Sequence, residues 1–235
     1  MSVVRGAAGR GRLPSKRAKL SREDIIVAAL EMSDAAPDLD AVTIRSLAHR
    51  LNVGTMTLYG YFRSKEDLLD AVADHVMGTL RMPDVPDESP GEAIRAVADA
   101  FLDLMSEHPS VVALLATRTT RSRDSMRVAM EAVLRRLVSA GLPAPLATQC
   151  YGFLIQHAIG YTTYRAPRPW GWASTPEVQE LRRQQEHFYA ALPVTDFPLV
   201  VEWASELVLL PAQETYNFAV DALVARVNQL VAQEI

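Results

Sequence analysis

Residues 41–65 carry four cations and no carboxylate, although the whole chain has 28 acids against 24 bases and a net charge of −4. The cations are Arg45, Arg50, Arg63 and Lys65. Guanidinium and ammonium groups bind phosphate, and a stretch without carboxylates does not repel it. The chemistry that these residue types favour is therefore contact with the backbone of a nucleic acid.

Two short helices joined by a tight turn are expected to position these cations. Thr43 is a predicted N-cap. The apolar residues behind it follow the i, i+3, i+4, i+7 spacing of a buried helix face: Ile44, Leu47, Ala48 and Leu51. Residues 52–54 (Asn-Val-Gly) interrupt this pattern, since Asn and Gly tolerate positive φ. A second helix is expected over residues 55–62, buried through Leu58 and Phe62.

The other side of this second helix is expected to face outward. At about 100° per residue it carries uncharged side chains that are small, polar or aromatic: Met56, Thr57, Gly60 and Tyr61. This arrangement describes a helix-turn-helix, whose second helix enters a DNA groove. The alternatives are a pair of core helices with a solvated rim, and a similar head that binds protein. The carboxylate-free window favours nucleic acid.

Residues 43–69 extend this pattern into a longer signature, T-I-R-S-L-A-H-R-L-N-V-G-T-M-T-L-Y-G-Y-F-R-S-K-E-D-L-L. It resembles the DNA-binding signature of the tetracycline-repressor (TetR) family of bacterial regulators, and the match over residues 58–69 is its most specific part. The resemblance covers about residues 20–80. It implies a homodimeric, all-helical repressor that binds a double-stranded DNA operator and loses DNA affinity when a small-molecule effector binds.

The resemblance also implies a role for particular residues. Thr55, Met56, Thr57, Gly60 and Tyr61 occupy positions that face the major groove, where hydroxyl and methyl groups can contact base edges. Tyr59 and Lys65 match positions that contact phosphate, and Thr43 and Arg45 should reach the backbone or a flanking base. The alternative for Tyr59 and Tyr61 is half-buried packing. Gly60 fits either a close approach to DNA or a tolerated surface glycine.

The distribution of charge and the positions of prolines predict the domain organisation. Residues 1–22 hold seven bases and no acid, so residues 1–20 are expected to form a disordered basic arm or a solubilising tail. A DNA-binding domain is expected over residues 21–82, including a connecting helix at 65–81. Pro83, Pro86 and Pro90 mark a linker. Residues 90–235 show only helical periodicity, which predicts a ligand-binding and dimerisation domain in an all-α protein.

A candidate ligand cavity follows from one helix expected over residues 145–165. A stripe that is both aromatic and polar runs along it, as in many ligand sites. The alternative is a packed core with one hydrogen-bonded histidine, which would give the same sequence pattern. The stripe comprises Gln149, Phe153, His157, Tyr161 and Tyr164. Two tryptophans, Trp170 and Trp172, are candidates for a lid or pocket mouth, with the anchoring of a rigid loop as the alternative. The remaining candidates are Phe101, Met105, His108, Met126 and Met130.

The last helix is expected to help build a homodimer interface. Its apolar residues recur every three or four positions: Val220, Leu223, Val224, Val227, Leu230 and Val231. In the family that the chain resembles, helices corresponding to 145–165 and 212–233 form such an interface. The alternative is packing within one chain.

Other functional classes find little support. The single cysteine, Cys150, excludes an internal disulfide and fits a reducing cytoplasm. The five histidines show no metal-ligand spacing, and no glycine-rich loop suggests a phosphate-binding cofactor site, so neither an enzyme nor a metal or cofactor protein is expected. No apolar run reaches membrane-span length, and the N-terminal residues contain no apolar h-region of a secretory signal, which predicts a cytoplasmic protein without a membrane partner.

Overall fold

The computed structural model describes residues 20–35, 42–83, 85–117, 122 and 125–233, apart from the side chains of 126–128. This part of the chain is helical and contains no strand, which confirms the expected all-α class. The predicted basic arm over residues 1–20 lies outside the described residues, except for Leu20.

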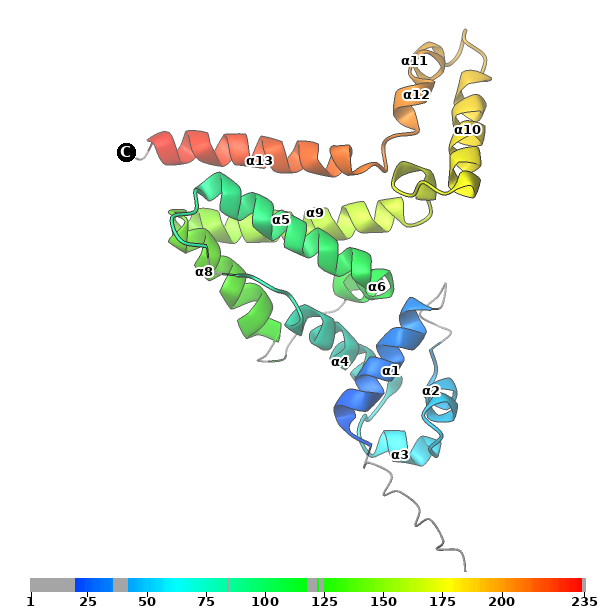
Figure 1. Cartoon of the computed structure of the whole chain (residues 1–235), viewed down its shortest axis with the longest axis vertical. Coiled ribbons are helices and arrows are strands. Elements are labelled where there is room, and N and C mark those ends of the chain that lie inside the picture. The colour runs from blue at the N-terminus through cyan, green and yellow to red at the C-terminus, as the bar shows by residue number, and fades with distance from the viewer. Residues whose placement is uncertain (1–19, 36–41, 84, 118–121, 123–124, 234–235) are drawn as a thin grey trace, which may run out of the picture.

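The N-terminal head is built from α1 (Arg22–Asp34), α2 (Ile44–Arg50) and α3 (Thr55–Tyr59) (Figure 1). Capping boxes begin the first two helices, with Ser21 hydrogen-bonded to Asp24 and Thr43 to Ser46. Each box satisfies backbone N–H groups that would otherwise lack a partner. The turn between α2 and α3 contains Asn52 with φ of 53°, a left-handed conformation that Asn tolerates.

The second helix of the predicted helix-turn-helix, α3, is shorter than the expected range of 55–62. It ends at Tyr59, and Gly60 is its C-cap at φ −71° rather than an interior residue. The connecting helix α4 (Lys65–Gly78) also stops before the expected residue 81. These ends change which side chains face outward, because the helical repeat no longer applies beyond Tyr59.

The C-terminal body is a bundle around α5 (Pro90–Glu107), α9 (Ala144–Arg165) and α13 (Gln213–Gln233) (Figure 1). Tyr216 of α13 is fully buried between the other two helices and donates a hydrogen bond to the Ala98 carbonyl at 2.8 Å. Burial raises the pKa of Tyr216, so its hydroxyl stays protonated and can donate this hydrogen bond. Gly91 permits close packing here, since a Cβ would lie 2.9 Å from Val224 Cγ1.

The head docks on the body through α6 (Pro109–Thr117), which packs against both α1 and α4. Asp34, at the end of α1, accepts a hydrogen bond from Ser110 Oγ at 2.5 Å and lies 2.9 Å from His108 Nδ1. A carboxylate at a helix C-terminus is unfavourable. These two partners offset that cost and join the first helix of the head to the α5–α6 corner.

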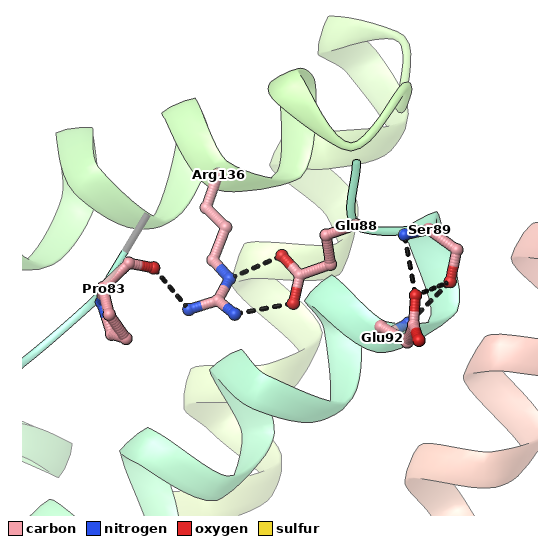
Figure 2. Close-up of polar contacts among 5 residues, drawn as sticks. All are labelled: Pro83, Glu88, Ser89, Glu92 and Arg136. Carbon is pink, nitrogen blue, oxygen red and sulfur yellow. Dashed lines mark hydrogen bonds and ion pairs between the residues drawn. The ribbon is translucent and has the colours of Figure 1, made fainter. Parts of the chain in front are cut away.

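A buried ion pair fastens the linker between α4 and α5 to α8 (Ala132–Ser139), which follows the π-helical turn η2 (Met126–Glu131). Figure 2 shows the Arg136 guanidinium bidentate on Glu88, at 2.6 and 2.8 Å, with a further bond to the Pro83 carbonyl at 3.1 Å. Next to it, Ser89 and Glu92 form the capping box of α5 (Figure 2). The proline-rich linker is therefore held at both ends.

The segment from η3 to α12, here called the arm, projects from one end of the bundle (Figure 1). It consists of η3 (Pro169–Gly171), α10 (Pro176–Ala190), α11 (Pro198–Glu202) and α12 (Ala204–Leu207). Trp203 separates α11 from α12, because its backbone is non-helical at φ −105° and ψ 27°. Gly171 lets η3 approach Pro211, because a Cβ there would lie 2.5 Å from its ring.

Candidate nucleic-acid interface and cavity

One side of α3 is anchored in the head and the other faces solvent. Leu58 and Phe62 are buried in the head core, as predicted. Met56, on the opposite side, is 78% exposed, and Thr55 and Thr57 beside it are also exposed. The outward side thus presents two hydroxyls and a thioether, groups that can hydrogen-bond base edges and contact thymine methyls.

The two tyrosines beside this face behave differently. Tyr59 is 49% exposed at the end of α3. Tyr61 is half-buried and donates a hydrogen bond from its hydroxyl to the Leu20 carbonyl at 2.5 Å. The expectation that Tyr61 faces outward with Met56 and Thr57 is therefore wrong. The helix ends before Tyr61, and the following turn directs its ring against the core.

The flanking polar residues lie at helix starts. Thr43 caps α2, and its hydroxyl accepts a hydrogen bond from Ser46 N at 3.0 Å. Arg45 is exposed in the first turn of α2, and Lys65 begins α4. Arg50 is ion-paired with Glu31 at 2.5 Å.

Arg22 is a cation near α3 that the sequence reasoning missed. Its guanidinium lies 4.7 Å from the centre of the Phe62 ring. No local pattern singles it out, because the contact joins the first turn of α1 to a residue 40 positions later.

A hollow of about 420 Å³ lies between α9 and the start of α13. It brings together three of the predicted ligand residues, His157, Tyr161 and Tyr164. The other residues that line it are Gln156, Gly160, Leu210 and Thr215. None of the seven is an acid, a lysine or an arginine; three carry rings, and Gln156 and Thr215 add polar groups.

His157, which lines the hollow, stacks with two other rings. The His157 ring lies parallel to Phe153 on one side, at 5.5 Å, and to Tyr216 on the other, at 4.5 Å. His157 Nε2 is 3.0 Å from the Tyr216 carbonyl, and the Tyr161 hydroxyl donates to the Pro211 carbonyl at 3.1 Å. A carbonyl only accepts, so Nε2 must carry a proton. These bonds fix both rings before any ligand arrives.

Several predicted ligand residues lie elsewhere. Phe101 and Met105 are buried in the bundle core, where the Phe101 ring meets Tyr151 edge-on at 6.0 Å, so their assignment to this cavity is wrong. Their stripe on α5 faces α9 and α13, and neither residue lines the hollow. His108 lines a separate hollow between the end of α4 and α5.

The remaining candidates surround the bundle without lining the hollow. Gln149, Met130 and Trp172 are exposed, and Trp170 is partly buried. The Trp172 indole donates to the Arg165 carbonyl at 3.3 Å, which holds the ring against the end of α9. The side chain of Met126 lies outside the described residues.

The predicted seam on α13 is largely used within the chain. Val220, Val224 and Val227 are buried against the bundle, and so the alternative of internal packing applies to them. The outer side of α13 instead exposes Phe218, at 76%. Periodicity identified an apolar stripe correctly but could not say which surface covers it.

Cys150 is buried, and this burial raises the pKa of its thiol to about 11. Only the thiolate is nucleophilic, so at pH 8 about one thiol in a thousand is reactive even before access is considered.

In the described part of the chain no group of three or more His, Cys, Asp or Glu side chains is placed to hold a metal ion, and no described helix combines the length and apolarity of a membrane span.

We therefore expect Cys150 to resist Ellman's reagent in the native protein at pH 8 and to react rapidly once guanidinium unfolds the chain. Absorbance at 412 nm measures both rates. Rapid labelling of the native protein, equal to that of the unfolded chain, would contradict the placement of Cys150 in the core.

Comparison with known sequences identifies relatives of both halves of the chain. The family model for bacterial regulatory proteins of the tetR family matches residues 25–72, and that for the tetracyclin repressor-like C-terminal domain matches residues 82–225. An HTH-type transcriptional repressor of Mycobacterium tuberculosis is 28% identical over 150 residues, or 62% of this chain and 57% of the relative. The repressor DrrR1 of Streptomyces coeruleorubidus is 33% identical over 138 residues, or 57% of this chain and 50% of the relative. The chain thus spans about half the length of these relatives.

The fold also resembles solved structures. ActR of Streptomyces coelicolor, a TetR family protein solved in complex with actinorhodin, aligns with a TM-score of 0.73 at 24% identity. The alignment covers 91% of this chain and 99% of ActR. At this identity the likeness supports the helical architecture, from the N-terminal head to the segment from η3 to α12.

Proposed function

Because the chain belongs to the tetR family of bacterial regulatory proteins, we propose that it is a transcriptional repressor that binds a palindromic DNA operator as a homodimer and leaves it when a small-molecule effector binds. The family consists of regulators rather than enzymes. The observation that carries the DNA-binding part is the outward side of α3, where Met56 is 78% exposed between two exposed threonines. Acting on DNA places the protein in the cytoplasm.

In this proposal α3 enters the major groove. Thr55, Met56 and Thr57 contact base edges, and Gly60 lets the end of the helix approach the DNA. Tyr59, Lys65, Thr43 and Arg45 contact the backbone on either side. Phosphate contacts fix the position of the head, while base-edge contacts select the sequence.

We propose that residues 21–82 form the DNA-binding domain and residues 90–235 the ligand-binding and dimerisation domain. Homodimerisation through α9 and α13 is supported by large apolar side chains that remain exposed on these helices. They include Phe153 and Phe218. One short α3 makes few base contacts, and a two-fold dimer doubles them on adjacent turns of one duplex.

Effector binding is assigned to the hollow beside His157, Tyr161 and Tyr164. The route to the head runs through the bundle to α6, which packs on α1 and α4, and through the contacts of Asp34 with His108 and Ser110. If an effector lowers operator affinity by some factor, the operator lowers effector affinity by the same factor. The complex of ActR with actinorhodin supports a small-molecule role for this fold.

Fluorescence anisotropy with DNA from upstream of the protein's own gene tests the DNA-binding function. If Arg45 and Lys65 of each head neutralise phosphates, a dimer releases about four counterions, and affinity should fall about 10²-fold between 50 and 200 mM salt. A shuffled duplex of the same composition serves as control. Equal affinity for both duplexes, or an affinity that ignores salt, would reject the proposal.

A further inference from the structure

Two guanidinium groups lie against aromatic rings at one end of the hollow. Arg165 is 5.4 Å from the Tyr161 ring centre and 5.3 Å from that of Trp172, and Arg168 is 4.0 Å from that of Tyr164. Tyr161 and Tyr164 line the hollow, so each guanidinium contacts a lining ring, although neither arginine is itself a lining residue. Two tyrosine rings and two guanidinium groups therefore lie together at this end: Tyr161, Tyr164, Arg165 and Arg168.

Both guanidinium groups are held in place and retain unused donors. Arg165 donates to Ser106 Oγ at 2.7 Å, and Arg168 donates to the Tyr164 carbonyl at 2.6 Å. A guanidinium has five N–H donors, and each of these bonds uses one. Arginines at the end of α9 also complement the negative end of the helix dipole, but that role does not require them to stack on lining rings.

The lining itself has no carboxylate to repel an anion or attract a cation. Its available polar groups are the Gln156 amide and the hydroxyls of Tyr164 and Thr215, because the Tyr161 hydroxyl and His157 Nε2 already bond to backbone carbonyls. Glu214, next to Thr215 in the chain, is solvent-exposed. Flat ring faces next to fixed cations favour a flat, negatively charged ligand.

We propose that the effector is a planar aromatic molecule with an acidic group, whose rings contact His157, Tyr161 and Tyr164 and whose anion faces Arg165 and Arg168. The inference rests on the proposed effector site and names the chemistry that this site selects. A carboxylate, sulfonate or acidic phenol would serve, since a guanidinium binds each through charge-assisted hydrogen bonds.

A matched pair of fluorescent probes tests this class with the full-length protein. 1-Anilinonaphthalene-8-sulfonate and N-phenyl-1-naphthylamine share the same ring system, but only the first is an anion. We expect the sulfonate to bind the hollow about tenfold more tightly. Arg168→Gln and Arg165→Gln should each remove most of that preference and leave the affinity of the neutral probe unchanged. Arg182→Gln, on exposed α10, is the matched control and should change neither.

Gly160→Leu identifies which binding occurs in the hollow. A Cβ at Gly160 meets no atom within 4 Å, so leucine there fills the hollow without disturbing its walls. It should weaken both probes, and circular dichroism confirms folding of every variant. Equal affinity of the two probes, or an unchanged preference in both arginine variants, would overturn the proposed class while leaving the cavity in place. If Gly160→Leu affects neither probe, the hollow is not the site, and the effector part of the proposed function fails with it. The DNA-binding part of the proposed function is tested by separate operator-binding measurements, so it stands whichever of these two results is found.

Discussion

Met56→Asp should abolish specific DNA binding, with a loss of affinity of at least about 100-fold. Met56 is the most exposed large apolar side chain in the described part of the chain, at 78%, and it lies at the centre of the outward side of α3. A carboxylate there would face the phosphates and base edges of the groove, and like charges brought together in an interface cost several kcal/mol. Because the site is exposed, the free energy of unfolding should change by no more than about 0.5 kcal/mol.

The measurement is anisotropy with the promoter duplex at fixed salt, together with thermal unfolding of the same samples. Val85→Asp is the control, since it places the same charge on a 48% exposed apolar residue of the linker. It should bind within about twofold of the wild type, as expected for a surface change outside the interface. If Met56→Asp also binds that well, α3 does not enter the groove.

Arg136→Ala should destabilise the protein more than any surface substitution, by about 3–5 kcal/mol. The side chains of Arg136 and Glu88 are 9% and 8% exposed, and the pair is bidentate. Removing the guanidinium leaves a buried carboxylate without its cation and also frees the Pro83 carbonyl (Figure 2). For a chain of this length each kcal/mol shifts Tm by about 2–4 °C, so a fall of about 10 °C is expected at constant protein concentration.

Arg135→Ala is the matched control for this ion pair. Arg135 is the neighbouring residue of α8, is 69% exposed and pairs with Glu131 at 3.1 Å one turn earlier. Such exposed i,i+4 pairs contribute about 0.3–0.5 kcal/mol, so its Tm should move by no more than about 2 °C. Equal shifts in the two variants would show that the Arg136–Glu88 pair does not fasten the linker.

The head could be predicted closely because its signals are local. Helical spacing identified the buried side of α2, and Leu58 and Phe62 are buried as expected. The placement of Tyr61 failed for a local reason too. The 100° rule holds only while the helix continues, and α3 ends at Tyr59, after which Tyr61 N and Phe62 N both bond to the Leu58 carbonyl.

The cavity could be predicted only in part because its walls come from distant segments. His157, Tyr161 and Tyr164 share one helix, so their spacing in the sequence reveals them. Leu210 and Thr215 lie about 50 residues further along and have no pattern of their own. Phe101 and Met105 show the reverse problem, since an apolar helical stripe looks the same whether another helix or a ligand covers it.

The surface that covers the seam on α13 could not be predicted from the sequence for the same physical reason. A row of valines predicts that something apolar covers it, but the choice between the chain's own α5 and α9 and a second chain depends on tertiary packing. Gly91, which lets α5 approach Val224, contributes to that choice and carries no periodic signal.

Hydroxyl-radical footprinting of the full-length protein on the DNA upstream of its own gene tests most directly whether two α3 helices occupy one duplex. The expected result is a pair of protected patches on one face of the DNA, related by two-fold sequence symmetry and centred about one helical turn, or a multiple of it, apart. Both patches should vanish with Met56→Asp. A single patch, or protection that spreads evenly over any sequence and persists in that variant, would contradict the proposed mode of DNA binding.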